Sequence, residues 1–109
     1  MRMITTLALA GLAGALAAAP ASAEEPADIA YGRALVEENC ARCHGVGTDD
    51  ESAHPDAPAF RTLAERYPID ALEEGFAEGI VTGHPDMPEF IASPEQIGAI
   101  IAYIESVQR

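Results

Sequence analysis

The sequence contains no lysine and no tryptophan, and it has only two cysteines among 109 residues. Basic side chains are scarce, because six arginines stand against 18 aspartates and glutamates. A chain with this negative charge repels the phosphates of nucleic acids and anionic lipid headgroups. We therefore exclude nucleic-acid binding and expect any protein partner to present a basic face.

The N-terminal segment differs in composition from the rest of the chain. Arg2 is followed by an uncharged stretch rich in Ala, Leu and Gly over residues 3–19, and then by Pro-Ala-Ser-Ala at 20–23. A basic start, an apolar stretch and an A-x-A site predict a secretory signal peptide over residues 1–23. The alternative is an uncleaved membrane anchor, although a membrane span needs about 20 strongly apolar residues.

Removal of that segment would leave a single domain over residues 24–109, with five arginines, 18 acids and a formal charge of −13. We expect this domain in the periplasm, without membrane insertion. A domain of that length is marginally stable unless a disulfide, a metal or a cofactor supports it. Its aromatic residues are only three phenylalanines and three tyrosines. A bound group is therefore expected to fill part of the interior.

The periodicity of apolar residues predicts helices separated by proline-rich loops, which is an all-α fold. We expect helices over residues 27–40, 59–65 and 69–79. A last helix should begin after Ser93, which is a suitable N-cap and has glutamine three positions later. The apolar stripe of this last helix is Ile97, Ile100, Ile101, Ile104 and Val107.

The residues most informative about chemistry are Cys40-Ala41-Arg42-Cys43-His44. The spacing C-x-x-C-H is the attachment signature of c-type haem, in which two thioethers fix the porphyrin and the histidine binds the iron. A disulfide between such close cysteines is geometrically awkward, and a zinc site would want four ligands. A thioredoxin-like redox pair would follow a β-strand, and none is expected here. Haem attachment through Cys40 and Cys43, with His44 as an axial ligand, is the prediction.

Over nearly the whole of residues 24–109 the chain resembles the small class I cytochromes c of bacteria. The matching residues are Gly32, Leu35, Cys40-Ala41-Arg42-Cys43-His44, Ala57-Pro58, the stretch 79–90 around Met87-Pro88, and Tyr103. The resemblance implies a cytochrome c-like fold wrapped around one covalently attached haem. It also implies that the first and last helices cross at Gly32 and Tyr103, and that the backbone carbonyl of Pro58 accepts a hydrogen bond from His44.

The second axial ligand is expected to be Met87, the only methionine after residue 23. It lies in a proline-stiffened loop, and the resemblance places the distal ligand of the family at this point. Methionine raises the reduction potential relative to a second imidazole and closes the sixth coordination position. His54 and His84 are the competing ligands, and we expect both to be solvent-facing loop residues.

Other residues around the haem are assigned less directly. We expect the walls of the haem pocket to include Phe60, Leu63, Ile80, Phe90 and Ile97. Four arginines have two alternative explanations, contact with the haem propionates or a solvated position on a helix: Arg33, Arg42, Arg61 and Arg66. The absence of lysine removes the basic docking ring of mitochondrial relatives, so the partners of those proteins are not carried over.

These features together predict a periplasmic one-electron carrier that is not an enzyme. It would be a monomer with one haem c, and it would meet redox proteins through their basic faces. One alternative is a dedicated cytochrome subunit of a periplasmic oxidoreductase complex. The other is a haem sensor or peroxidase with an open coordination site, which would require Met87 to be absent from the iron.

Overall fold

The computed structural model describes residues 6–16, 25–79 and 84–109. Its helical elements are α1 (Ala27–Asn39), the 3₁₀-helix η1 (Phe60–Glu65), α2 (Ile69–Glu78) and α3 (Pro94–Val107). These described ranges contain no β-strand, so the expected all-α class is confirmed. Each helix lies within one residue of the range that the sequence predicts at either end.

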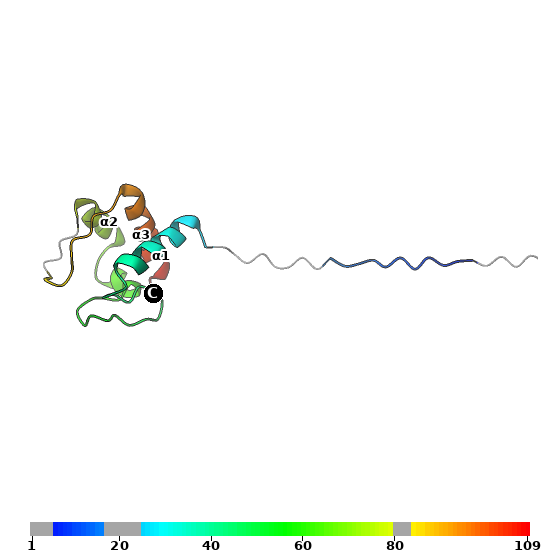
Figure 1. Ribbon diagram of the computed structural model, residues 1–109, viewed down its shortest axis with the longest axis horizontal. Coiled ribbons are helices and arrows are strands. Elements are labelled where there is room, and N and C mark those ends of the chain that lie inside the picture. Colours follow the sequence, from blue (N-terminus) through cyan, green and yellow to red (C-terminus); the bar gives the residue numbers. More distant parts are fainter. Residues whose placement is uncertain (1–5, 17–24, 80–83) are drawn as a thin grey trace, which may run out of the picture.

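Residues 6–16, drawn in blue in Figure 1, do not pack against the helices. They are exposed and have no regular secondary structure. The A-x-A site at residues 21–23 lies outside the described residues. Within the ranges that the structure covers, no helix combines the length and apolarity that crossing a bilayer requires.

Helices α1 and α3 cross each other and form the centre of the fold (Figure 1). The crossing occurs at Gly32, where a Cβ atom would lie 1.9 Å from the carbonyl oxygen of Ala99 and 2.8 Å from Cβ of Tyr103. Only a residue without a side chain allows the two backbones to approach this closely. The crossing of Gly32 and Tyr103 that the resemblance implies is therefore present.

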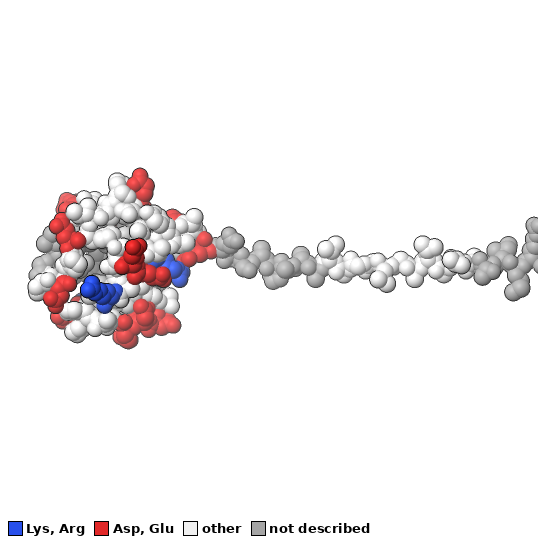
Figure 2. All heavy atoms as spheres, in the orientation of Figure 1, with Lys and Arg blue, Asp and Glu red and all other residues white. Residues whose placement is uncertain are grey.

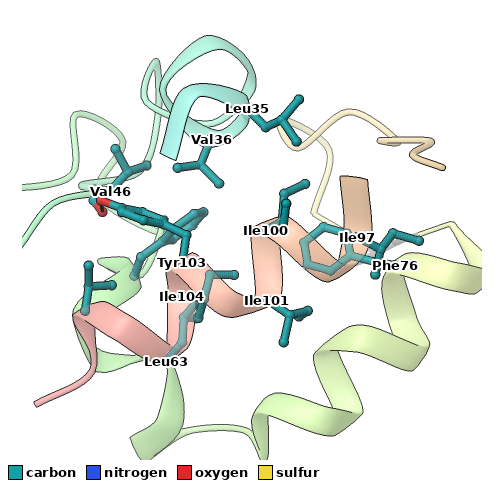
Figure 3. Close-up of a cluster of buried hydrophobic side chains, with 13 residues drawn as sticks. Leu35, Val36, Val46, Leu63, Phe76, Ile97, Ile100, Ile101, Tyr103 and Ile104 are labelled. Atoms are coloured by element: carbon teal, nitrogen blue, oxygen red, sulfur yellow. Dashed lines mark hydrogen bonds between the residues drawn. The ribbon is translucent and has the colours of Figure 1, made fainter. Parts of the chain in front are cut away.

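Helix α3 is anchored at its start and buried along its length. Ser93 Oγ accepts from the backbone N–H of Gln96, whose side chain accepts from the N–H of Ser93, which is the expected capping box. Figure 3 shows the side chains of α3 pointing toward α1 on one side and toward η1 and α2 on the other. Within this core the Tyr103 hydroxyl donates a 2.6 Å hydrogen bond to the carbonyl of Val46. Burial raises the pKa of Tyr103, which keeps that donor protonated.

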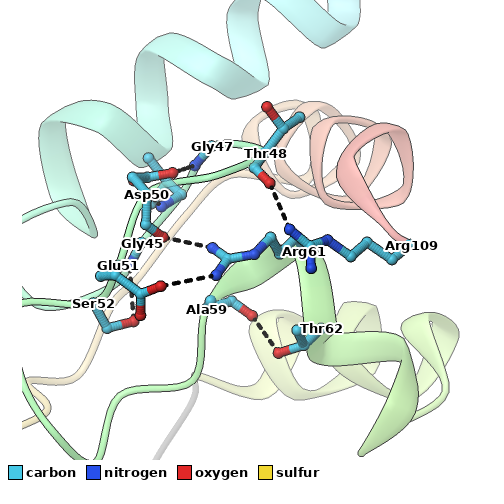
Figure 4. Close-up of polar contacts among 11 residues, drawn as sticks. Gly45, Gly47, Thr48, Asp50, Glu51, Ser52, Ala59, Arg61, Thr62 and Arg109 are labelled. Carbon is cyan, nitrogen blue, oxygen red and sulfur yellow. Dashed lines mark hydrogen bonds and ion pairs between the residues drawn. The ribbon is translucent and has the colours of Figure 1, made fainter.

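The acidic turn after residue 44 is ordered by its own side chains (Figure 4). The carboxylate of Asp50 accepts from the backbone N–H groups of Val46, at 2.9 Å, and Gly47, at 2.6 Å. The buried guanidinium of Arg61 donates to the backbone carbonyl of Asp50 and pairs with Glu51 at 3.7 Å. These contacts fix the turn against η1. The turn connects His44 to the loop that contains Pro58.

Candidate haem site

Cys40, Cys43 and His44 lie on one turn at the end of α1. Cys40 caps the helix, and its carbonyl accepts from the N–H groups of Cys43, at 3.2 Å, and His44, at 2.9 Å. Both cysteines are free and partly buried. Burial raises the pKa of the Cys40 thiol to about 11, so this side chain stays uncharged at neutral pH. The tight turn presents two thiols and an imidazole to the same space.

The imidazole of His44 is held by a backbone carbonyl from the following loop. Its Nδ1 lies 2.8 Å from the carbonyl oxygen of Pro58, the contact that the resemblance implies. Because a carbonyl only accepts, Nδ1 must carry the proton, and the lone pair of Nε2 is left for another partner. The ring of Phe60 lies beside His44, with 5.1 Å between the ring centroids. The chain is turned back toward η1 by a 2.8 Å bond from the N–H of Phe60 to the carbonyl of Gly45.

A large cavity opens in front of this imidazole. Its volume is about 1330 Å³, and its lining brings together Cys40, Cys43, His44, Pro58 and Met87. Apolar side chains from η1, α2, α3 and the loop before α3 form much of the rest. They are Phe60, Leu63, Leu72, Phe76, Phe90 and Ile104. Ligand pockets usually occupy about 300–1,000 Å³, so this cavity has room for a bound group.

Met87 reaches the cavity from the loop that connects α2 to α3. Its backbone N–H donates to the carbonyl of His84 at 3.2 Å, which closes a turn over residues 84–87. The loop begins at Gly79, which ends α2 with a φ of 81°, a conformation that favours glycine. Two residues beyond Pro88 the loop meets α2 again, because the rings of Phe90 and Phe76 pack edge to face with centroids 6.4 Å apart.

Three of the five expected pocket walls line the cavity, namely Phe60, Leu63 and Phe90. The expectation for Ile97 is wrong: this side chain is buried in the core and also lines a separate, smaller pocket between α2 and the start of α3. Ile80 lies outside the described residues. Sequence reasoning missed the contribution of α2, where Ile69, Leu72 and Phe76 recur at i, i+3 and i+7 and signal an apolar face.

The two competing histidines do not simply face solvent. Their side chains are 24% exposed for His54 and 37% exposed for His84, and both lie at the edge of the cavity. His54 Nε2 lies 3.0 Å from a carboxylate oxygen of Asp86, and this hydrogen bond lowers the pKa of Asp86. His84 Nε2 lies 3.3 Å from a carboxylate oxygen of Asp56. Both histidines lie in loops and are partly exposed, as expected, and each is also hydrogen-bonded to an aspartate of the other loop.

The arginines divide into two groups. Arg42 and Arg66 line the cavity, so both stay candidates for contact with an anionic group there. Arg33 instead pairs with Glu25 and lies over the Tyr103 ring, 5.5 Å from its centroid. Arg61 donates to the backbone carbonyl of Asp50 in the acidic turn. Figure 2 shows acidic side chains over several parts of the visible face, with basic side chains confined to small areas.

Comparison with known proteins agrees with this geometry. The family model for cytochrome c matches residues 29–108. Cytochrome c-552 of Bradyrhizobium diazoefficiens is 36% identical over 103 residues, which cover 94% of this chain and 97% of that protein. Cytochrome c550 of Pseudomonas aeruginosa is 33% identical over 87 residues, covering 72% of this chain and 55% of that protein. No solved structure gives a significant match.

The chain belongs to the cytochrome c family, and within it to the bacterial class I monohaem cytochromes c. It binds haem c covalently and is an iron protein of electron transport. The residues present fit this group: two free thiols and an oriented imidazole stand at the wall of an apolar cavity that the side chains leave open. Proteins of this family pass electrons to redox partners.

Proposed function

We propose that this protein is a periplasmic one-electron carrier whose haem is attached through Cys40 and Cys43 and whose iron is held by His44 and Met87. The observation that carries the proposal is the 2.8 Å contact between His44 Nδ1 and the Pro58 carbonyl. It leaves Nε2 as the only ring nitrogen with an available lone pair. When bound, the haem supplies a reversible one-electron couple at its iron.

The role of Met87 is supported by its place on the cavity that His44 and both cysteines also line. The turn over residues 84–87 and Pro88 restrict how far this loop moves. A thioether in the sixth position favours the reduced state and leaves no position for a small ligand. With the haem bound, the apolar side chains from η1, α2 and α3 would cover part of it, which would limit the change in solvation on electron transfer.

The test of ligand identity is the Met87→Ala variant, compared with His84→Ala as a matched control from the same loop. Wild type and His84→Ala are expected to show the weak far-red sulfur-to-iron band in the ferric spectrum and a positive reduction potential. Met87→Ala should lose the band and fall in potential. Loss of the band in His84→Ala but not in Met87→Ala would refute the assignment.

The acidic surface is proposed to steer the carrier to partners with a basic face. The domain has five arginines against 18 acids, and the attraction between opposite charges is screened as salt is added. Stopped-flow oxidation by a small cationic complex should therefore slow as ionic strength rises, whereas oxidation by a small anionic complex should accelerate. Equal salt dependence with both oxidants would contradict steering.

A monomer is expected in sedimentation, and a stable complex with one oxidoreductase would instead identify a dedicated subunit.

The periplasmic location is proposed from the signal-peptide pattern of residues 1–23. Mass spectrometry of protein from the periplasmic fraction should give the mass of residues 24–109 plus one haem. A variant with Ala23→Gln changes the cleavage site and is expected to accumulate with the N-terminal segment attached. A mature protein that retains residues 1–23 would show that this segment is an anchor rather than a signal.

A further inference from the structure

The sequence contains the tripeptide His-Pro-Asp twice, at residues 54–56 and at residues 84–86. Both copies fold in the same way. The backbone N–H of Asp56 donates to Nδ1 of His54 at 3.1 Å, and that of Asp86 donates to Nδ1 of His84 at 3.3 Å. Because an N–H only donates, Nδ1 of each imidazole must be the unprotonated nitrogen. Without a bound ion the proton of each ring is therefore on Nε2, and each turn presents this N–H outward in a fixed direction.

The two turns pair with each other across the rim of the cavity. Nε2 of His54 faces Asp86 at 3.0 Å, and Nε2 of His84 faces Asp56 at 3.3 Å. The imidazole rings are perpendicular, with centroids 5.3 Å apart. One ligand atom from each of His54, His84 and Asp86 lies within 4.8 Å of the others. Two nitrogens and a carboxylate oxygen therefore converge from loops that are distant in the sequence.

We propose that these paired turns bind one divalent d-block metal ion of the Zn²⁺ class, with His54, His84 and Asp86 as ligands and Asp56 available as the fourth. Imidazole and carboxylate ligands suit Zn²⁺ and its neighbours, whereas Ca²⁺ and Mg²⁺ prefer oxygen alone. The negative charge of the domain raises the local concentration of cations. This site is separate from the haem ligands His44 and Met87.

Binding requires a modest contraction and a change of tautomer. The proton of each ring moves from Nε2 to Nδ1, and the backbone N–H contacts to Nδ1 open. Bonds of about 2.0–2.1 Å to a tetrahedral ion place the ligand atoms about 3.4 Å apart. The atoms here lie within 4.8 Å, so displacements of about 1 Å bring them to an ion. The side chains of Asp56 and Asp86 are 68% and 65% exposed, which leaves a path for the ion and space for the carboxylates to turn toward it.

Metal binding at this point would act on the haem region. It would tie the loop around residue 54 to the turn over residues 84–87, whose last residue is Met87. The side chains of His54 and His84 are partly buried, whereas those of Asp56 and Asp86 are exposed. All four line the large cavity. A positive charge there favours reduced iron, so the reduction potential should rise. This last consequence rests on the proposed function, whereas binding itself does not.

The experiment is equilibrium dialysis of untagged, haem-loaded protein against Zn²⁺. Haem-loaded protein is used because the free thiols of Cys40 and Cys43 would otherwise compete for the ion. We expect one equivalent of bound Zn²⁺ that millimolar Mg²⁺ does not displace. His54→Gln and Asp86→Asn should each weaken binding by at least about tenfold. The matched control Glu105→Gln removes one exposed charge from α3 and should leave binding unchanged.

A second measurement needs no variant. In proton NMR of the reduced wild-type protein, Zn²⁺ should shift the ring resonances of His54 and His84 and leave those of His44 in place. Displacement of Zn²⁺ by Mg²⁺, or equal binding by wild type and the double variant His54→Gln/His84→Gln, would overturn the proposal. Either result would leave the far-red band of the haem spectrum, and with it the assignment of Met87, unaffected.

Discussion

The close approach of α1 and α3 at Gly32 predicts the effect of replacing this residue by alanine. The new Cβ would lie 1.9 Å from the carbonyl oxygen of Ala99, whereas non-bonded contacts lie at about 3.5 Å. The obstacle is the backbone of α3, so it does not move aside as a flexible side chain would. Helices α1 and α3 would have to separate by about 1.5 Å, which also disturbs the packing of Tyr103.

Two opposing contributions set the magnitude. Overpacking of a core costs about 1–3 kcal/mol, and a backbone clash belongs at the upper end of that range. Replacing glycine by alanine inside a helix contributes about 1 kcal/mol of stability. We expect Gly32→Ala to lower the free energy of unfolding by about 2 kcal/mol, which is about 8–16 °C in Tm for a domain of this size.

Gly98 provides the matched control, because it lies on the exposed side of α3 and a Cβ there would meet nothing within 4 Å. Gly98→Ala should raise the free energy of unfolding by about 0.5–1 kcal/mol through helix propensity alone. The assay is denaturant unfolding of the haem-loaded proteins, followed by circular dichroism and by the haem spectrum. If Gly32→Ala proves as stable as Gly98→Ala, the close crossing of α1 and α3 is not a feature of the folded protein.

Three further effects are expected in the same assay. Tyr103→Phe removes the donor to the buried carbonyl of Val46 and should cost about 1–3 kcal/mol; an unchanged midpoint would contradict that bond. Burial raises the pKa of Tyr103 in the folded state above its value of about 10 in the unfolded chain. Wild type should therefore lose stability as the pH rises from the pKa of the unfolded state through that of the folded state, and Tyr103→Phe should lose less over that range. Ser93→Ala removes the cap of α3 and should cost about 1 kcal/mol, whereas Ser93→Asp should retain most of the stability.

The parts of the fold that depend on neighbours in the sequence are predictable from it. The start of α3 is one example, because Ser93 and Gln96 form their capping box within a single turn. The turn of Cys40, Cys43 and His44 is another, since its hydrogen bonds join residues three or four apart. In both cases the residues that specify the structure also make the contacts.

Contacts between elements that are distant in the sequence cannot be predicted from such local patterns. Periodicity assigns Ile97 and Phe76 alike to buried faces, but only the packing of α2 against α3 decides that Phe76 lines the cavity and Ile97 does not. The pairing of His54 with Asp86 joins residues 32 positions apart. The repeated tripeptide His-Pro-Asp is visible in the sequence, but the pairing of its two copies follows only from the folding of both loops around the cavity.

The central claim is that Met87 closes the iron site and makes this protein an electron carrier. The most direct measurement is the optical spectrum of haem-loaded protein matured in a periplasm, ferric and reduced, before and after addition of carbon monoxide. We expect a low-spin c-type spectrum with the far-red band, which carbon monoxide leaves unchanged. A high-spin spectrum that shifts on addition of carbon monoxide would show an open site and would contradict it.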